Sequence, residues 1–419
     1  MRLINTYTLQ LEEFTGKPPS YAILSHTWTG EEVSLQEFTS PSPPIHKEGY
    51  AKITNSCAIT RKQVRTMLDK LFENTSFNWG GMNDGKQFLE YLWVDTCCID
   101  KSSSAELSES INSMFRWYRD SRIFYAYLAD VSSGPDFAID FRRSKWFRRG
   151  WTLQELIAPC DVHFYSKEWD LLGTRDNLAD LIAEVTSIDS VLLRRNSVAL
   201  SRNTDIDVML DSFSVARRMS WAAERKTTRE EDIAYCLMGI FKINMPLLYG
   251  EGQRAFLRLQ EEIVKVYNDQ SILAWQHPND PDGTFVIPPI SSLWAMHPSF
   301  FHKWVDVSFS KPQVPMSLDS RGLELEVDLL TDFEPPLMNG TSFAILQGHI
   351  HGDHLSRPAI QLDPIVGLEG MFRRKSGSPL LVLRRGATPH IDFVGPEPYF
   401  SELPMSQEGF ISERQCKIA

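Results

Sequence analysis

Short apolar runs separated by helix-like stretches make up the first part of the chain. Three runs of five or six residues, at 21–25, 91–95 and 123–128, have the length of buried strands. Between them, apolar residues recur every three or four positions over 53–71 and 107–118, which indicates amphipathic helices. Strands that alternate with helices predict an α/β fold with a parallel sheet flanked by crossover helices.

The pattern becomes mostly helical after residue 161. A fourth apolar run at 162–165 predicts one more strand, and helical spacing follows over 178–185, 232–241 and 251–267. Apolar helix faces need a surface on which to pack. We therefore expect a helical extension that packs on the α/β domain and does not form a free unit.

A change of composition marks the C-terminal part of the chain. The segment 277–283, His-Pro-Asn-Asp-Pro-Asp-Gly, is typical of a linker. Beyond it apolar and polar residues alternate again, most clearly over 323–327, which predicts strands. The expected parts are an α/β domain over 1–160, a helical extension over 161–275 and a small β-rich domain over 284–419.

Polar residues end two of the predicted strands. Ser25 and His26 close the first apolar run, and Asp95 closes the second. The carboxyl ends of parallel strands lie at one edge of a sheet, where ligand sites form. We therefore expect both polar ends to lie at one edge of the domain, with Ser25, Asp95 and the later Glu155 converging on one cleft there. A turn at Ser25 and His26 and a loop or helix cap at Asp95 are the simpler alternatives.

The stretch 147–159, Phe-Arg-Arg-Gly-Trp-Thr-Leu-Gln-Glu-Leu-Ile-Ala-Pro, joins a basic run to a short helix. Gly150 allows a turn, and the helix formers over 153–158 run up to Pro159, which stops the helix. Glu155 lies off the apolar face of this helix, beside arginines and near its start, where a carboxylate is favoured as the anion. The simpler alternative is a solvated glutamate on an amphipathic helix.

Composition and charge exclude several classes of protein. The 419 residues are 42% hydrophobic and 23% charged, as in a globular protein of two or three domains. The formal charge of -11 argues against a general nucleic-acid coat. The six cysteines lack CxxC spacing, so we expect neither a metal site nor a disulfide framework, and a cytoplasmic location fits. We also expect no membrane span, since no apolar run approaches about 20 residues, and no signal peptide.

Four stretches together resemble the fungal heterokaryon-incompatibility domain, known as the HET domain. They cover 21–28, 92–100, 150–159 and 235–252, in the order expected for that family. The chain has Thr29, Lys101 and Arg148 where the family often has Gly, Gln and Thr. The HET domain is in turn similar to TIR domains. The resemblance therefore implies a TIR-like parallel sheet flanked by helices, followed by the helical extension and the small β-rich C-terminal domain.

The resemblance to TIR domains also implies a chemistry. Plant-type TIR domains carry a Trp-Cys-Leu-x-Glu-Leu motif whose glutamate cleaves NAD, and residues 151–156 align with it, so that Glu155 takes the catalytic place. Cleavage of the nicotinamide–ribose bond passes through an oxocarbenium-like state, which one ionised carboxylate can stabilise. The implied enzyme is an NAD nucleosidase that takes NAD as its substrate and needs no cofactor.

Residues near the motif could bind the rest of the dinucleotide. Arg148 or Arg149 could donate bidentate hydrogen bonds to the pyrophosphate, and Trp28, Trp93 or Trp151 could form flat walls against the rings. The remaining binding candidates are Ser25, His26 and Asp95. The simpler alternatives are core packing for Trp151 and a solvated face for the basic run. Cys97 or Cys98, with His26 as base, would be an alternative thiol nucleophile.

Two functions from different classes follow from the resemblance. In the first, a cytoplasmic fungal incompatibility protein self-associates as a homo-oligomer, hydrolyses NAD and triggers programmed cell death, with NAD and an incompatibility partner protein as its partners. In the alternative, the domain is a non-enzymatic scaffold that self-associates and binds partner receptors, and Glu155 is structural.

Overall fold

Two compact units make up the chain. The computed structural model describes residues 1–73, 89–195, 205–276, 293–301, 307–308, 314–330, 342–350, 356–368, 370–374, 381–384, 390–392, 403–404 and 411–418. The first unit comprises Met1–Ile206 with Cys236–Leu247, and the second Asp207–Tyr235 with Leu248–Ala419. The border crosses the expected helical extension, and the expected linker at 277–283 lies outside the described residues. The three expected domain limits therefore stay a prediction.

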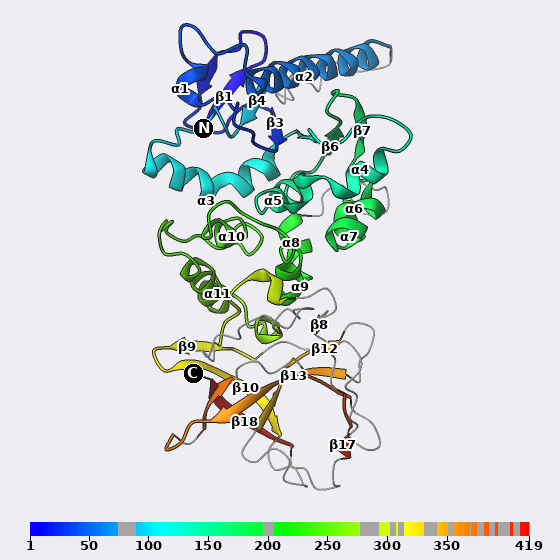
Figure 1. The fold of residues 1–419 in the computed structure, drawn as a ribbon. Helices are drawn as coiled ribbons and strands as arrows, with labels where there is room; N and C mark the ends of the chain where they lie inside the picture. Colours follow the sequence, from blue (N-terminus) through cyan, green and yellow to red (C-terminus); the bar gives the residue numbers. More distant parts are fainter. Residues whose placement is uncertain are drawn as a thin grey trace. The chain divides into compact units, whose positions relative to one another are not determined.

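A mixed sheet lies at the centre of the first unit (Figure 1). Its strands are β1 Arg2–Asn5, β2 Leu11–Glu13, β3 Tyr21–His26, β4 Tyr91–Val94, β5 Ile123–Tyr127, β6 Val162–Tyr165 and β7 Leu171–Thr174. Within the described residues the strand order is β2-β1-β4-β3-β5-β6-β7. The four inner strands are parallel, which confirms the sheet predicted from the apolar runs. The outer strands β1, β2 and β7 pair antiparallel with their neighbours, and the sequence pattern did not predict them.

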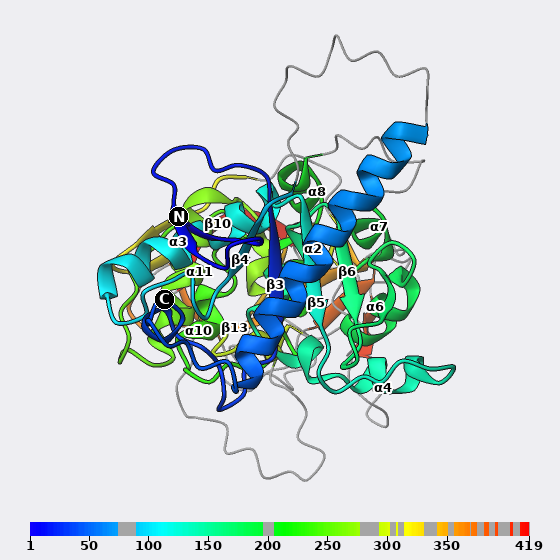
Figure 2. The ribbon, with the colours of Figure 1, turned by 90° about the horizontal axis from the view of Figure 1, so that it is seen from above.

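Helices cover both faces of this sheet. They are α1 Leu35–Phe38, α2 Glu48–Glu73, α3 Ser104–Asp120, α4 Phe137–Arg143, α5 Thr152–Ile157, α6 Ala179–Thr186 and α7 Ser190–Leu193, with the 3-10 turn η2 Lys145–Arg148. The long α2 lies along one face, and α3 and α5 lie on the other (Figure 1 and Figure 2). Thr60 of α2 donates to the hydroxyl of Tyr125 at 3.3 Å. On the other face, the hydroxyl of Tyr21 donates to the carbonyl of Trp117 in α3 at 2.7 Å.

The helix α5 confirms the one predicted over 153–158. It ends before Pro159, as the sequence indicates. The buried guanidinium of Arg175 donates to the carbonyls of Leu156 and Pro159 at 2.8 Å and of Cys160 at 2.9 Å. The last carbonyls of a helix have no partner within the helix, so the bond to Leu156 satisfies one of them, and the bonds to Pro159 and Cys160 hold the chain just after α5.

The segment Cys236–Leu247 returns from the second unit to the first. Gln154 of α5 donates to the carbonyl of Cys236 at 2.5 Å. Gly239 packs so closely on α3 that a Cβ there would lie 2.3 Å from the Cβ of Phe115. The helix predicted over 232–241 is wrong in length, because α10 ends at Tyr235, where the chain leaves the second unit.

The second unit combines helices with a barrel-like sheet. Its helices, with α8 at the border, are α8 Ile206–Asp211, α9 Val215–Ser220, α10 Asp232–Tyr235, α11 Arg254–Val266, η3 Gln270–Leu273 and η4 Pro298–Phe300. Its strands are β8 Val307–Ser308, β9 Ser317–Asp319, β10 Gly322–Leu330, β11 Ser342–Ile345, β12 His349–Ile350, β13 Ser356–Pro364, β14 Met371–Arg374, β15 Leu381–Arg384, β16 His390–Asp392, β17 Leu403–Pro404 and β18 Ile411–Ile418.

The strands of the second unit confirm the β-rich C-terminal part predicted from the alternating pattern. The path β11-β10-β18-β14-β13 closes on itself, because β13 also pairs with β11. Closure pairs both edges of these strands, which protects them from association with other sheets.

Candidate functional site

The end of β3 presents its last two side chains to opposite faces of the sheet. Side chains alternate along a strand, so Ser25 shares the face of Tyr21, toward α3 and α5, and His26 points toward α2. Tyr127 of β5 pairs in register with His26, so the two side chains share a face of the sheet. Burial and then the charge of Glu48 in α2 raise the pKa of Tyr127, which shows that this face is the one toward α2. Ser25 and His26 therefore leave the same strand end toward opposite faces of the sheet, and a binding role for His26 stays a prediction.

On the face of α3 and α5, Ser25 binds the carboxylate of Glu155. The hydroxyl of Ser25 donates to Oε2 of Glu155. The indole N–H of Trp146 in η2 donates to Oγ of Ser25 at 2.7 Å. Ser25 and Trp146 are buried, and Glu155 is half-buried. The structure thus brings together two of the predicted residues, which lie 130 positions apart in the chain.

Asp95 belongs to the same cluster. Leu24 of β3 pairs in register with Val94 of β4. The residues that follow them, Ser25 and Asp95, therefore lie next to each other at the ends of the two strands. Tyr118 of α3 lies close to both acidic groups: burial, and then the charges of Glu155 and Asp95, raise the pKa of Tyr118 well above its usual value. The charges of Asp95 and Glu155 therefore both reach the buried hydroxyl of Tyr118, which places the two carboxylates in one cluster.

An exposed aromatic ring with two cations adjoins Asp95. The Nζ atom of Lys101 lies 4.0 Å from Oδ2 of Asp95 and 3.6 Å from the ring centroid of Trp28. Trp28 is 45% exposed. The guanidinium of Arg149 lies 5.9 Å from the same centroid. A cation over an indole face is stabilised by the ring quadrupole, and this ring remains open to a ligand.

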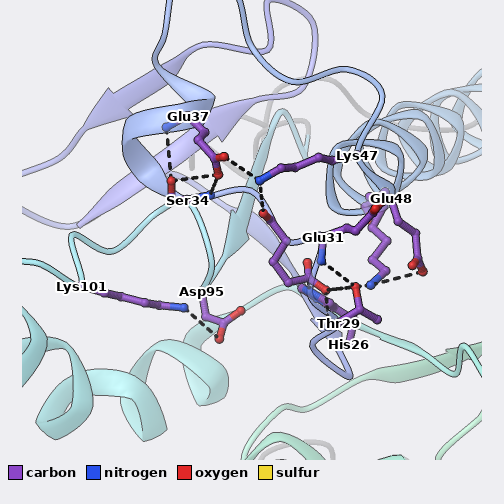
Figure 3. A network of polar contacts seen from close by, with 12 residues as sticks. His26, Thr29, Glu31, Ser34, Glu37, Lys47, Glu48, Asp95 and Lys101 are labelled. Carbon is purple, nitrogen blue, oxygen red and sulfur yellow. Dashed lines mark hydrogen bonds and ion pairs between the residues drawn. The ribbon is translucent and has the colours of Figure 1, made fainter.

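On the face of α2, an ion network surrounds His26 (Figure 3). Glu32 accepts hydrogen bonds from Nε2 of His26 and from Nζ of Lys52, both at 2.8 Å, and from the backbone N–H of Thr29 at 3.0 Å. Lys52 is buried and also lies 3.4 Å from Glu48. Burial opposes ionisation of Glu32, but the bonds from His26 and Lys52 outweigh it and lower the pKa of Glu32 to about 2. The pair of Asp95 and Lys101 lies apart from this network in Figure 3.

The other predicted residues lie near α5 or in the core. Arg148 is exposed on η2, and Trp151 is half-buried at the start of α5. Trp93 is buried against Trp117 and Tyr118, as expected for core packing. Cys97 and Cys98 are buried, and burial raises the pKa of the Cys97 thiol well above its usual value. A buried thiol with a raised pKa is a poor nucleophile. The burial of both thiols thus gives no support to the thiol alternative.

Sequence reasoning did not identify Glu32, Lys52 or Trp146. Lys52 forms an i,i+4 pair with Glu48, but both residues precede the helix predicted over 53–71, because α2 begins earlier, at Glu48. Glu32 lies in a loop without periodicity, and Trp146 lies inside the basic run, so neither had a local signal. The described residues contain no group of three His, Cys, Asp or Glu side chains that could hold a metal. None of the helices in the described ranges is long and apolar enough to cross a membrane.

Comparison with known proteins finds similarity in two parts of the chain. Residues 21–141 match the family model described as heterokaryon incompatibility protein (HET), and residues 254–286 match a domain of unknown function, DUF8212. The chain is 44% identical over 277 residues to the vegetative incompatibility protein HET-E-1 of Podospora anserina. The aligned part covers 64% of this chain and 18% of that protein, so the chain spans under a fifth of that relative.

The comparisons also limit what the resemblance carries. The family match ends at residue 141, before Glu155. No solved structure matches the chain, so its resemblance to TIR domains stays a prediction.

Proposed function

We propose that the chain acts in vegetative, or heterokaryon, incompatibility and that its first unit cleaves the nicotinamide–ribose bond of NAD. The match of residues 21–141 and the similarity to HET-E-1 support the biological role. The chemistry rests on one observation: the hydroxyl of Ser25, at the end of β3, donates to the carboxylate of Glu155. That bond holds a half-buried anion at the edge of the sheet where ligands bind in α/β folds.

Glu155 supplies the charge that this reaction needs. As the bond to nicotinamide breaks, positive charge develops on the ribose, and a fixed carboxylate stabilises it. Glycosidases need a second carboxyl group to protonate the leaving group. Nicotinamide takes the bonding electron pair and leaves as a neutral molecule, so no acid is needed. Water then bonds to the anomeric carbon and releases one proton, which gives ADP-ribose.

The cluster around Trp28 suits the rest of the dinucleotide. Lys101 and Arg149 carry positive charges that fit the pyrophosphate, and Arg can bind it with two hydrogen bonds. The exposed face of Trp28 offers a stacking surface for a base. Trp151 and Arg148 are further candidates for ring and phosphate contacts. His26 is left out, because it faces α2.

The direct test is incubation of the purified full chain with NAD over a wide range of protein concentrations. Nicotinamide and ADP-ribose are measured by chromatography. We expect release to rise more than linearly with protein concentration, since self-association would complete a site built from loops at strand ends. Constant activity per molecule, with a monomer at every dilution, would contradict the association step.

A non-enzymatic scaffold is the second candidate. The observation in its favour is that Ser25 and Trp146 are buried, so that the bond to Glu155 could serve the fold alone. In that case the protein would self-associate and bind partner proteins, and no nicotinamide would be released at any concentration.

A further inference from the structure

Two hydrogen bonds of fixed direction connect Trp146, Ser25 and Glu155. An indole N–H can only donate, so Oγ of Ser25 is the acceptor in the 2.7 Å bond from Trp146. The hydroxyl of Ser25 carries a single proton, which it donates to Oε2 of Glu155. Trp146 therefore determines which way the hydroxyl of Ser25 points.

The ring of Trp146 is itself held rigidly. It is 0% exposed, and its ring contacts Phe147 and Phe164 edge-on, with centroid distances of 5.1 and 5.7 Å. Aromatic packing of this kind leaves a side chain few alternative rotamers. The direction of its N–H, and with it the place of the Glu155 carboxylate, is thus determined by the core of the first unit.

Trp93 provides a comparison inside the same unit. Its side chain is also buried, at 1% exposure, and its ring packs on Trp117 and Tyr118 of α3. Its Nε1 atom has no hydrogen-bond partner among the residues that the structure describes. Trp93 and Trp146 thus share burial and aromatic contacts, but only Trp146 donates to a residue that binds Glu155.

We propose that Trp146 is a positioning residue for NAD cleavage, which fixes the Glu155 carboxylate through Ser25. This inference rests on the proposed function and deepens it. Trp146 is fully buried, so it acts through Ser25 and not by direct contact with the substrate. Its role is to keep the carboxylate oriented before the substrate arrives, so that no reorientation is needed when charge develops on the ribose.

The first experiment compares Trp146→Phe with Trp93→Phe in the full chain. Both changes shorten a buried ring and remove an N–H, but only Trp146→Phe removes a bond to Ser25. We expect Trp146→Phe to lower kcat for nicotinamide release about tenfold with little change in KM, because the carboxylate loses orientation. Trp93→Phe should retain the wild-type kcat. An equal loss of kcat in both variants would overturn the inference.

A double-mutant cycle separates positioning from general damage to the fold. If Trp146 acts through Ser25, then Trp146→Phe should lower kcat no further in a Ser25→Ala background. Ser25→Thr keeps the hydroxyl and should restore most of the activity that Ser25→Ala loses. Losses that multiply in the double variant would show that Trp146 acts independently of Ser25, and would overturn the inference.

A spectroscopic test needs no enzymatic activity. In protein labelled with ¹⁵N-tryptophan, Ser25→Ala should shift the indole N–H resonance of Trp146 and leave that of Trp93 in place. An unmoved Trp146 resonance would overturn the positioning role even if NAD is cleaved. Absence of nicotinamide release from the wild type would instead overturn the proposed function, and the catalytic part of this inference with it.

Discussion

Ser25 and His26 are neighbours in the chain, yet they enter polar clusters of different kinds. His26 joins an ion network in which Glu32 is held between the ring of His26 and the buried ammonium of Lys52. Ser25 joins a cluster with two carboxylates, Glu155 and Asp95, whose cations lie beside an exposed indole ring. One cluster is closed, and the other opens toward solvent.

The difference indicates which cluster serves the fold and which serves a ligand. Removing one member of a buried ion pair leaves an uncompensated charge and costs about 3–5 kcal/mol of stability. A half-exposed carboxylate can be neutralised at small cost to the fold, but with a large effect on any reaction that uses its charge. Changes on the α2 face should therefore lower stability, and changes on the α5 face should lower activity.

The largest effect is expected from Glu32→Gln. Among the described residues, this change leaves Glu48 as the one carboxylate paired with the buried ammonium of Lys52, so the free energy of unfolding should fall by about 3–5 kcal/mol. Urea denaturation measures the loss. A second change, Lys52→Met, removes the stranded charge and should restore part of the stability. A Glu32→Gln protein as stable as the wild type would show that the closed network does not hold the fold.

Glu155→Gln should reduce nicotinamide release at least a hundredfold, or about 3 kcal/mol in activation free energy. The amide keeps the size of the side chain and can still accept the bond from Ser25, so urea denaturation should detect little change. The matched control is Glu184→Gln on α6, which removes the charge of an exposed residue paired with Arg142. Wild-type release from a folded Glu155→Gln protein would remove Glu155 from the mechanism.

Lowering the pH should reduce the free energy of unfolding, because Glu32 becomes protonated and its ion network is lost. Because the pKa of Glu32 is lowered from 4.5 to about 2 in the folded state, its contribution is present above pH 4.5 and is lost as the pH falls toward 2. The shift corresponds to about 3 kcal/mol of stability. Urea denaturation at pH values between 5 and 2 should show this loss, and Glu32→Gln should show a shallower dependence. Identical pH profiles would contradict the assignment.

The smallest effect is expected from Gly239→Ala. This change tests the packing of the Gly239 segment on α3 and alters no charged residue. The new methyl group would meet Phe115 at 2.3 Å, so α3 or the Gly239 segment must shift. We expect a loss of about 1–3 kcal/mol. Gly16→Ala adds the same group where nothing lies within 4 Å and should be nearly neutral. Equal thermal unfolding temperatures for both variants would show that the close contact carries no strain.

Much of the fold could be predicted, because its inner strands are continuous apolar runs and its main helices have apolar residues at helical spacing. The helix start at Ser103 shows where such reasoning stops. The hydroxyl of Ser103 accepts from the backbone N–H of Glu106 at 3.3 Å, as in a capping box. The carboxylate of Glu106, however, binds Arg2 and the backbone N–H of Asp100 instead of closing the box. A partner 104 positions away competes for the side chain, and no local pattern encodes it.

The candidate site was predictable in part for the same reason. Ser25 and Glu155 each follow a local rule, the polar end of a strand and the polar side of a short helix. Strand alternation, which the sequence does contain, sends the side chain of His26 to the face opposite Ser25. Glu32 and Lys52 could not have been joined to His26, since the contact depends on how a loop and α2 cross the end of β3.

The return of Cys236–Leu247 to the first unit has a consequence for synthesis on the ribosome. The stretch Met1–Ile206 emerges first, but Gly239, which packs on Phe115 of α3, follows only after residues 207–235 have been made. At about 5–20 residues per second, translation from Ile206 to Leu247 takes about 2–8 s. During that interval the nascent domain has all its inner strands but not the segment that covers α3, so apolar surface stays open to chaperones and to neighbouring nascent chains.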